Sequence, residues 1–266
     1  MSEITDHILS VAKSSGFDTE LKVAAILRSE RWSVSQSVYY IDKDEDKGRE
    51  LDALAYFGSR YTKDGEEVTC NIHLCIEVKK SAHPFIFFSN SPREYEGGTG
   101  YSMLKWMQGI NNSILPYRNF VAKQPLIRPE RICRSYTLSK GGGESKIKSG
   151  IISAFKAAVH WSETTEEPYN DTSKDLSLFI PILVVDAPLY ECYFPDDSSE
   201  LAAKKTSHLV YLQHYHSKKY KEISTRVNVV SLDYLPSLLQ SYKAWSQNIV
   251  DTIKDRMASR DSAKQS

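Results

Sequence analysis

The sequence has no excess of charge of either sign and few cysteines, and both shortages limit what the protein can be. Lys and Arg together number 34 and Asp and Glu also number 34, so the formal net charge is zero. Domains that bind nucleic acid are often basic overall, so any binding of a polyanion must depend on local patches. The four cysteines contain no C-x-x-C pair, so neither a zinc ribbon nor a disulfide-rich secreted scaffold is readable.

Long apolar runs and targeting signals are also missing. No stretch approaches the roughly 18 apolar residues of a membrane-spanning helix, so we expect no membrane partner. The segment MSEITDHILSVAKSS has no basic start followed by a long apolar run, so we expect no signal peptide and a cytoplasmic location. The glycine-rich segment SKGGGESKIKSG lacks the G-K-[ST] of a phosphate-binding loop, so it does not predict a nucleotide site.

The composition is that of a globular protein, with 41% hydrophobic and 26% charged residues. Its 266 residues suit a single domain over 1–266, with a core at about 15–190 and a C-terminal elaboration at about 191–258. Apolar periodicity predicts mixed α/β structure. The expected elements are helices over 18–31, 102–115, about 150–161 and from Pro236 onward, and strands over 34–41, 49–57, 71–79, 176–185, 208–215 and 226–232, with a hairpin loop over 58–70.

Three of these elements carry polar residues where apolar ones are expected. In the strand segment LCIEVKK, Glu77 and Lys79 share one face because residues two apart point the same way. Asp52 is a lone carboxylate in an apolar strand. Glu20 falls on the apolar stripe that begins at Phe17 in the first predicted helix. The simplest interpretation is a cross-strand ion pair for Glu77 and Lys79, and a helix-dipole contact at the stripe's margin for Glu20.

These residues and the order of their elements resemble the PD-(D/E)xK nuclease superfamily, which has the restriction-endonuclease-like fold. The matching segments are Glu20 in the first helix, Leu51-Asp52 at the middle strand, and Glu77-Val78-Lys79 at the end of the next strand. Leu51 stands where the eponymous proline would be, as in many members. The motif covers residues 15–80, and the overall look is closer to type IV-like restriction enzymes than to compact junction resolvases.

The resemblance implies an αβββαβ core with a mixed central sheet flanked by helices, and a strand and helix elaboration after it. It also implies a DNA endonuclease of the restriction, defence or repair type, with Glu20, Asp52, Glu77 and Lys79 as catalytic residues. Carboxylates prefer hard ions such as Mg²⁺ or Mn²⁺, so Asp52 and Glu77, with the Val78 carbonyl and Glu20, are the expected metal ligands. Lys79 would approach the scissile phosphate.

The partner is expected to be DNA, since basic residues gather locally even though the net charge is zero. Eight basic and two acidic residues occur between positions 118 and 148, and Lys140, Lys146 and Lys148 precede the second core helix, where they are candidate contacts to a DNA backbone. A homodimer or a partner subunit is a further candidate. Two other functions stay open: a catalytically silent nucleic-acid-binding or scaffold module on the same fold, and a nuclease that acts on RNA.

Overall fold

The computed structural model describes residues 3–63, 66–90, 104–106, 129–139, 144–165, 173–196 and 198–264. Its helices are α1 (Glu3–Ser15), α2 (Phe17–Ser29), α4 (Glu144–Thr164), α5 (Leu235–Lys264) and the short 3-10 helix η2 (Leu232–Tyr234). Its strands are β1 (Ser33–Asp42), β2 (Lys47–Lys63), β3 (Glu66–Lys80), β4 (Phe85–Asn90), β5 (Leu104–Trp106), β6 (Ile132–Leu138), β7 (Ser173–Asp186), β8 (Leu189–Tyr193), β9 (Ala202–Thr206), β10 (His208–Ser217) and β11 (Lys221–Ser231).

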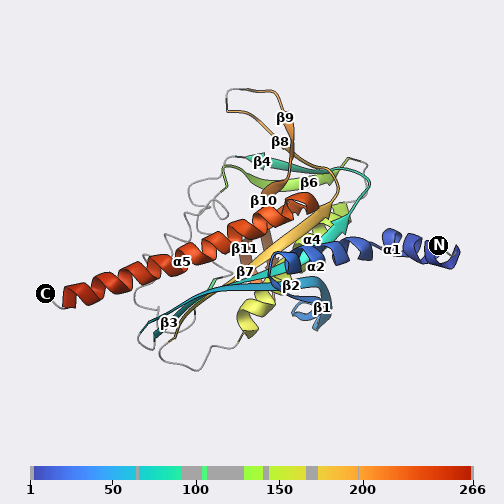
Figure 1. Ribbon diagram of the computed structural model, residues 1–266. Helices are drawn as coiled ribbons and strands as arrows, with labels where there is room; N and C mark the ends of the chain where they lie inside the picture. The colour runs from blue at the N-terminus through green and yellow to red at the C-terminus, as the bar shows by residue number, and fades with distance from the viewer. Residues whose placement is uncertain are drawn as a thin grey trace.

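One mixed sheet organises the described part of the chain (Figure 1). The strands follow the order β1-β2-β3-β7-β11-β10-β6-β4-β8-β9, and β5 pairs with β7. β1, β2 and β3 form an antiparallel meander, whereas β3 and β7 are parallel over the whole length from Glu67 to Lys80. The predicted α/β class with a mixed central sheet is confirmed.

Helices cover both faces of this sheet. α5 crosses one face (Figure 1) and packs with α2 against Ile72, Leu74 and Ile76 of β3. α4 lies on the other face, where Phe155 packs with Cys75 of β3 and Phe179 of β7. β7 is apolar on both sides because it lies between these two layers, as the nearly all-apolar run LSLFIPILVV predicts.

The hairpin of β2 and β3 is longer than the sequence predicts. The segment 58–70 is expected to be a loop, but its described residues extend both strands, which stay paired out to Lys63 and Glu66. The cause is tertiary: Val68 and Cys70 are fully buried in the core that α5 covers, and the Ser246 hydroxyl of α5 donates to the Cys70 carbonyl at 2.8 Å. A segment with a polar, loop-like sequence is therefore held as a strand by its packing against α5, a helix far away in the sequence.

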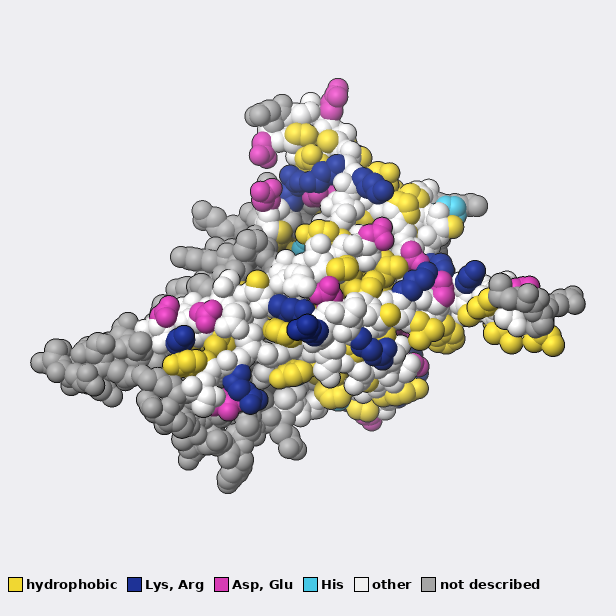
Figure 2. Space-filling view, viewed as in Figure 1, with side chains coloured by type: hydrophobic (Ala, Val, Ile, Leu, Met, Phe, Trp, Pro, Cys, Tyr) yellow, Lys and Arg dark blue, Asp and Glu magenta, His cyan; other side chains and the backbone are white. Residues whose placement is uncertain are grey.

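The predicted apolar stripe of α2 is wrong in part. Of the stripe Phe17, Leu21, Ala24, Ala25 and Leu27, the residues Ala24 and Leu27 are buried as expected, but Phe17 and Leu21 are 59% and 61% exposed, and Val23 is buried in addition. The helix is therefore rotated so that its first turn presents polar residues to the sheet end. Apolar side chains on α1 are also exposed, and this helix projects from the body of the molecule (Figure 2).

The structure also corrects the prediction of a helix over 102–115. Most of that segment lies outside the described residues, but Leu104–Trp106 form β5, antiparallel to Leu176–Leu178 of β7. Local periodicity did not foresee this pairing across the sheet. In the described part of the chain, no helix is long and apolar enough to cross a membrane.

The segment expected to be a C-terminal elaboration contributes central parts of the sheet and core. β11 pairs directly with β7, and β10 connects it to β6. The stripe of α5 that begins at Leu235 and ends at Ile253 is buried along its whole length, as its spacing predicts. These elements cover the sheet at its centre, so they support the strand that the candidate site occupies.

The core contains one hydroxyl whose removal should stabilise the protein. Tyr242 is 1% exposed, and its hydroxyl has no hydrogen-bond partner among the described residues. Because a buried unpaired polar group costs about 1–3 kcal/mol, Tyr242→Phe should raise the free energy of unfolding by about 1 kcal/mol in urea denaturation. Tyr220→Phe is the matched control: that hydroxyl accepts the Lys43 N–H at 3.2 Å, so its loss should lower stability.

Candidate active site at the end of β3

The C-terminal end of strand β3 places one carboxylate and one ammonium group together. Glu77 is 5% exposed, and its Oε2 accepts a hydrogen bond from Lys79 Nζ at 2.6 Å. Val78, between them, points to the opposite face and packs in the core under α2 and α5. The alternation predicted from the sequence is therefore confirmed, and it gives a buried ion pair on the α4 side of the sheet.

Asp52 joins this pair at the point where the β2–β3 ladder stops. The last paired residues are Ala53 and Ile76, so the Val78 N–H lies beyond the ladder. The Asp52 carboxylate takes the place of a backbone carbonyl there: its Oδ2 accepts the Val78 N–H at 2.7 Å. The same oxygen lies 3.9 Å from Lys79 Nζ, so Asp52 and Glu77 both face one ammonium group.

Glu20 approaches from the other helix layer. It is half-buried in the first turn of α2, and electrostatic interactions couple it to Asp52 and Lys79. Two contacts hold this turn against the sheet end: Thr19 Oγ1 donates to Asp186 Oδ2 at 2.9 Å, and Lys80 Nζ pairs with Asp18 at 3.0 Å. The structure thus brings Asp52, Glu77 and Lys79 into direct contact, whereas Glu20 acts on Asp52 and Lys79 only electrostatically.

The titration behaviour of the group follows from burial. Burial raises the pKa of Glu77 to about 7 and also raises the pKa values of Asp52 and Glu20, because the charged forms lose water. Lys79 opposes these shifts, and the carboxylates in turn raise the pKa of Lys79 against its own desolvation. Asp52 and Glu77 therefore share one ammonium group, and Glu20 adds negative potential around it, which favours binding of a further cation.

The donor atoms suit a hard divalent ion, although the geometry supplies few of them. Among the described residues, no group of three or more Asp, Glu, His or Cys is arranged to hold a metal ion. Asp52 and Glu77 nevertheless offer two carboxylates beside the Val78 backbone, and Mg²⁺ commonly keeps several waters and takes one or two carboxylates from the protein. This set of oxygen donors therefore fits Mg²⁺ or Mn²⁺. Glu20 is not part of the pair of carboxylates that would hold the ion.

Helix α4 contributes two residues that the sequence did not single out. The Ser153 hydroxyl lies 3.2 Å from the Tyr40 hydroxyl, and it slightly lowers the pKa of Glu77 against the effect of burial. Gly150 provides room for Lys79: a methyl group at this position would lie 3.2 Å from Lys79 Cε and 2.8 Å from Leu183 Cδ1. A glycine inside a predicted helix indicates a close packing contact, so Gly150 could have been noticed in the sequence. The sequence does not show that its neighbour is Lys79 of β3.

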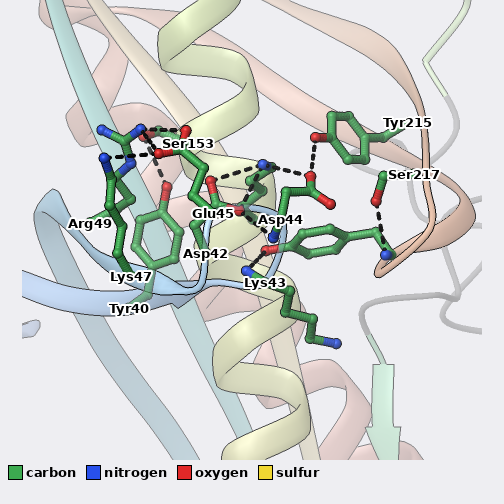
Figure 3. A network of polar contacts seen from close by, with 12 residues as sticks. Tyr40, Asp42, Lys43, Asp44, Glu45, Lys47, Arg49, Ser153, Tyr215 and Ser217 are labelled. Atoms are coloured by element: carbon green, nitrogen blue, oxygen red, sulfur yellow. Dashed lines mark hydrogen bonds and ion pairs between the residues drawn. The ribbon is translucent and has the colours of Figure 1, made fainter.

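A second buried ion cluster lies beside the site and joins three elements (Figure 3). Lys156 of α4 is 5% exposed, and its ammonium group donates to both oxygens of Asp42 and to Asp44 Oδ2 at 2.8 to 3.0 Å. The rings of Tyr215 and Tyr220 lie 5.0 and 5.1 Å from the same nitrogen. All three N–H groups of Lys156 are used, so this cluster anchors the β1–β2 turn rather than binding substrate.

The three lysines expected to contact DNA have different outcomes. Lys140 lies outside the described residues. Lys146 and Lys148 are both exposed on α4. Of these two, only Lys148 lines the cavity between α4 and the β1–β2 turn, next to the site. The two lysines therefore differ in position although they lie two residues apart.

His73 shares the face of Glu77 but belongs to the core. Its ring stacks on Phe179 with the centroids 4.5 Å apart and tilts against Tyr56 at 5.1 Å. Burial lowers the pKa of His73 to about 4. This supports a packing role, because an imidazole that stays neutral between two rings contributes dispersion contacts and no charge.

The lowered pKa of His73 predicts acid destabilisation. Below about pH 6.5 the unfolded chain protonates this imidazole whereas the folded chain does not, so stability should fall by up to about 3 kcal/mol as the pH decreases toward 4. His73→Phe keeps the stacking and should reduce the slope of unfolding free energy against pH, measured by urea denaturation. Replacing the exposed His83 is the control, and an equal change in both variants would contradict the prediction.

The close approach at Gly150 predicts a second effect. Gly150→Ala should lower the free energy of unfolding by up to about 2 kcal/mol, because overpacking costs about 1–3 kcal/mol and the gain in helix propensity offsets about 1 kcal/mol. Gly48→Ala is the matched control, since its new methyl group would meet only Tyr39 Cδ1 at 3.6 Å. Stabilisation of the Gly150→Ala variant would show that Lys79 and Leu183 do not press against this position.

Comparison of the chain with protein-family models, with curated proteins and with solved structures gave no match. The functional argument therefore depends on the geometry of Glu20, Asp52, Glu77 and Lys79.

Proposed function

We propose that this protein is a metal-dependent endonuclease that hydrolyses phosphodiester bonds in DNA. The observation that carries the proposal is the buried Glu77, hydrogen-bonded to Lys79 at 2.6 Å, with the Asp52 carboxylate on the other side of the same ammonium group. Phosphodiester hydrolysis requires an activated water and stabilisation of negative charge on the phosphate. This group combines metal-binding carboxylates with a cation directed to the same place.

The order of elements supports the same proposal. α2, β1, β2, β3, α4 and β7 follow one another along the chain with an insertion before α4, and β1, β2, β3 and β7 are neighbours in the sheet. This is compatible with the αβββαβ core that the sequence resemblance implies. The insertion and the strands after β7 enlarge the sheet without separating Asp52 from Glu77.

Each residue of the group has a distinct role in the proposed reaction. Bound Mg²⁺ or Mn²⁺ would supply Lewis acidity at the phosphate and a more acidic water. Asp52 and Glu77 would hold the ion, and Asp52 is fixed for this role by the Val78 N–H. Lys79, released from Glu77, would donate to a phosphate oxygen and stabilise its developing charge. Glu20, half-buried nearby, would orient the attacking water.

A structural ion cluster is the competing interpretation, and Asp52 gives it a specific basis. The carboxylate caps the β2–β3 ladder whether or not an ion binds. Burying an ion pair rarely stabilises a fold more than apolar residues of the same size do. Three carboxylates near one lysine at the end of a strand therefore contribute little to the free energy of folding. This favours a functional explanation for the group.

The test is cleavage of supercoiled plasmid DNA with and without Mg²⁺ or Mn²⁺. Wild-type protein should nick or linearise the plasmid only with metal, and Glu77→Gln and Lys79→Ala should each lower the rate by about 100-fold or more, as loss of one charge-stabilising group does. Lys205→Ala is the control, since Lys205 is exposed on β9, which lies at the far end of the strand order from β3. It should cut at the wild-type rate.

Calorimetric titration of metal completes this experiment. Metal binding that Glu77→Gln abolishes, together with cleavage, is the expected result. Absence of both cleavage and metal binding in folded wild-type protein would contradict the proposal and leave Glu77 and Lys79 as a structural ion pair. Thermal unfolding of each variant shows whether lost cleavage reflects a lost fold.

A further inference from the structure

A cavity of about 580 Å³ opens beside the candidate active site, between α4 and the β1–β2 turn. Its size lies within the range of small-ligand sites. Figure 3 shows part of its wall, with Tyr40 and Arg49 directed toward α4. The lining residues are Tyr40, Asp42, Glu45, Arg49, Glu50, Lys148, Ser149, Ile152, Ser153 and Lys156.

The cavity and the candidate active site share two residues. Ser153 lines the cavity and also acts on the Glu77 carboxyl, whose pKa it lowers slightly. Glu50 lines it and acts electrostatically on both Asp52 and Glu20. The cavity is therefore the neighbouring pocket for a molecule that reacts at Glu77 and Lys79.

Most charges in the wall already have partners. Asp42 is neutralised by Lys156, and Glu45 pairs with both Arg49 at 2.5 Å and Lys47 at 2.9 Å. Lys148 is exposed and has no ion-pair partner in the part of the chain that the structure describes. The unpaired cation thus lies on the α4 wall, and an incoming anion would meet it there.

Arg49 can join Lys148 at little cost. Its side chain is 42% exposed at the rim. Glu45 keeps its contact with Lys47 when Arg49 turns to a ligand, so no buried carboxylate is left alone. An arginine and a lysine on opposite walls are suited to the oxygens of one phosphate group.

We infer that this cavity binds the nucleotide adjoining the scissile phosphate. Lys148 and Arg49 bind that nucleotide's own phosphate, and the Ser149 and Tyr40 hydroxyls and the Ile152 side chain contact its sugar and base. This inference rests on the proposed function for its choice of a nucleotide. It assigns to Lys148 a defined contact, in place of a general attraction to DNA, and excludes Lys146, which lies outside the cavity.

The test is calorimetric titration with thymidine 5′-monophosphate, with thymidine as the comparison that lacks phosphate. Wild-type protein should bind the monophosphate at least tenfold more tightly than thymidine. Lys148→Glu should weaken monophosphate binding by tenfold or more, and Lys146→Glu, the same charge change two residues away, should stay within about twofold. No binding to wild type, or equal losses in the two variants, would overturn the inference.

Plasmid cleavage separates this inference from the proposed function. If monophosphate binding depends on Lys148 but wild-type protein leaves the plasmid intact, the nucleotide site stands and the nuclease proposal fails. If wild-type protein cuts the plasmid but binds no monophosphate, the nuclease stands and the cavity assignment fails. Arg49→Gln is the second variant, and a loss smaller than twofold would remove Arg49 from the site.

Discussion

The candidate site depends on one interaction, that of the Lys79 ammonium group with the carboxylates of Glu77 and Asp52. Each of these groups loses water on folding, and a buried charge without a partner costs several kcal/mol. The arrangement survives because Lys79 lies 2.6 Å from one carboxylate and 3.9 Å from the other. Gly150 of α4 leaves room for Lys79, since a methyl group at that position would lie 3.2 Å from Lys79 Cε. A single lysine therefore connects the chemistry of the strand end to the packing of the helix above it.

The long parallel pairing of β3 with β7 gives this strand end its rigidity. It runs without interruption from Glu67 to Lys80, and β11 supports β7 from the other side. Both strands are buried between α4 on one face and α2 with α5 on the other. Side chains on rigid, buried elements are held in place better than those on loops, which suits the role that we propose for this group.

The two ion clusters of α4 illustrate how similar residues serve different purposes. Lys156 uses all its N–H groups on Asp42 and Asp44, so its charge is matched and it fastens the β1–β2 turn. Lys79 faces more carboxylates than it can neutralise, which leaves the site negative. The cavity is lined by Asp42 and Lys156 of the neutralised cluster, and Ser153 and Glu50 of its lining act electrostatically on the residues of the other group.

The sequence by itself determined what short-range periodicity controls. Alternation along β3 placed Glu77 and Lys79 on one face, the nearly all-apolar run marked β7 as buried, and the stripe of α5 was readable from its spacing. Only the tertiary structure decided what depends on distant partners. It extended β2 and β3 through the expected loop, rotated α2 so that Phe17 and Leu21 face outward, and brought Gly150 and Ser153 over the site. The physical reason is separation along the chain: Asp42 and Lys156 lie 114 residues apart, and no local pattern records which distant group will satisfy a buried charge.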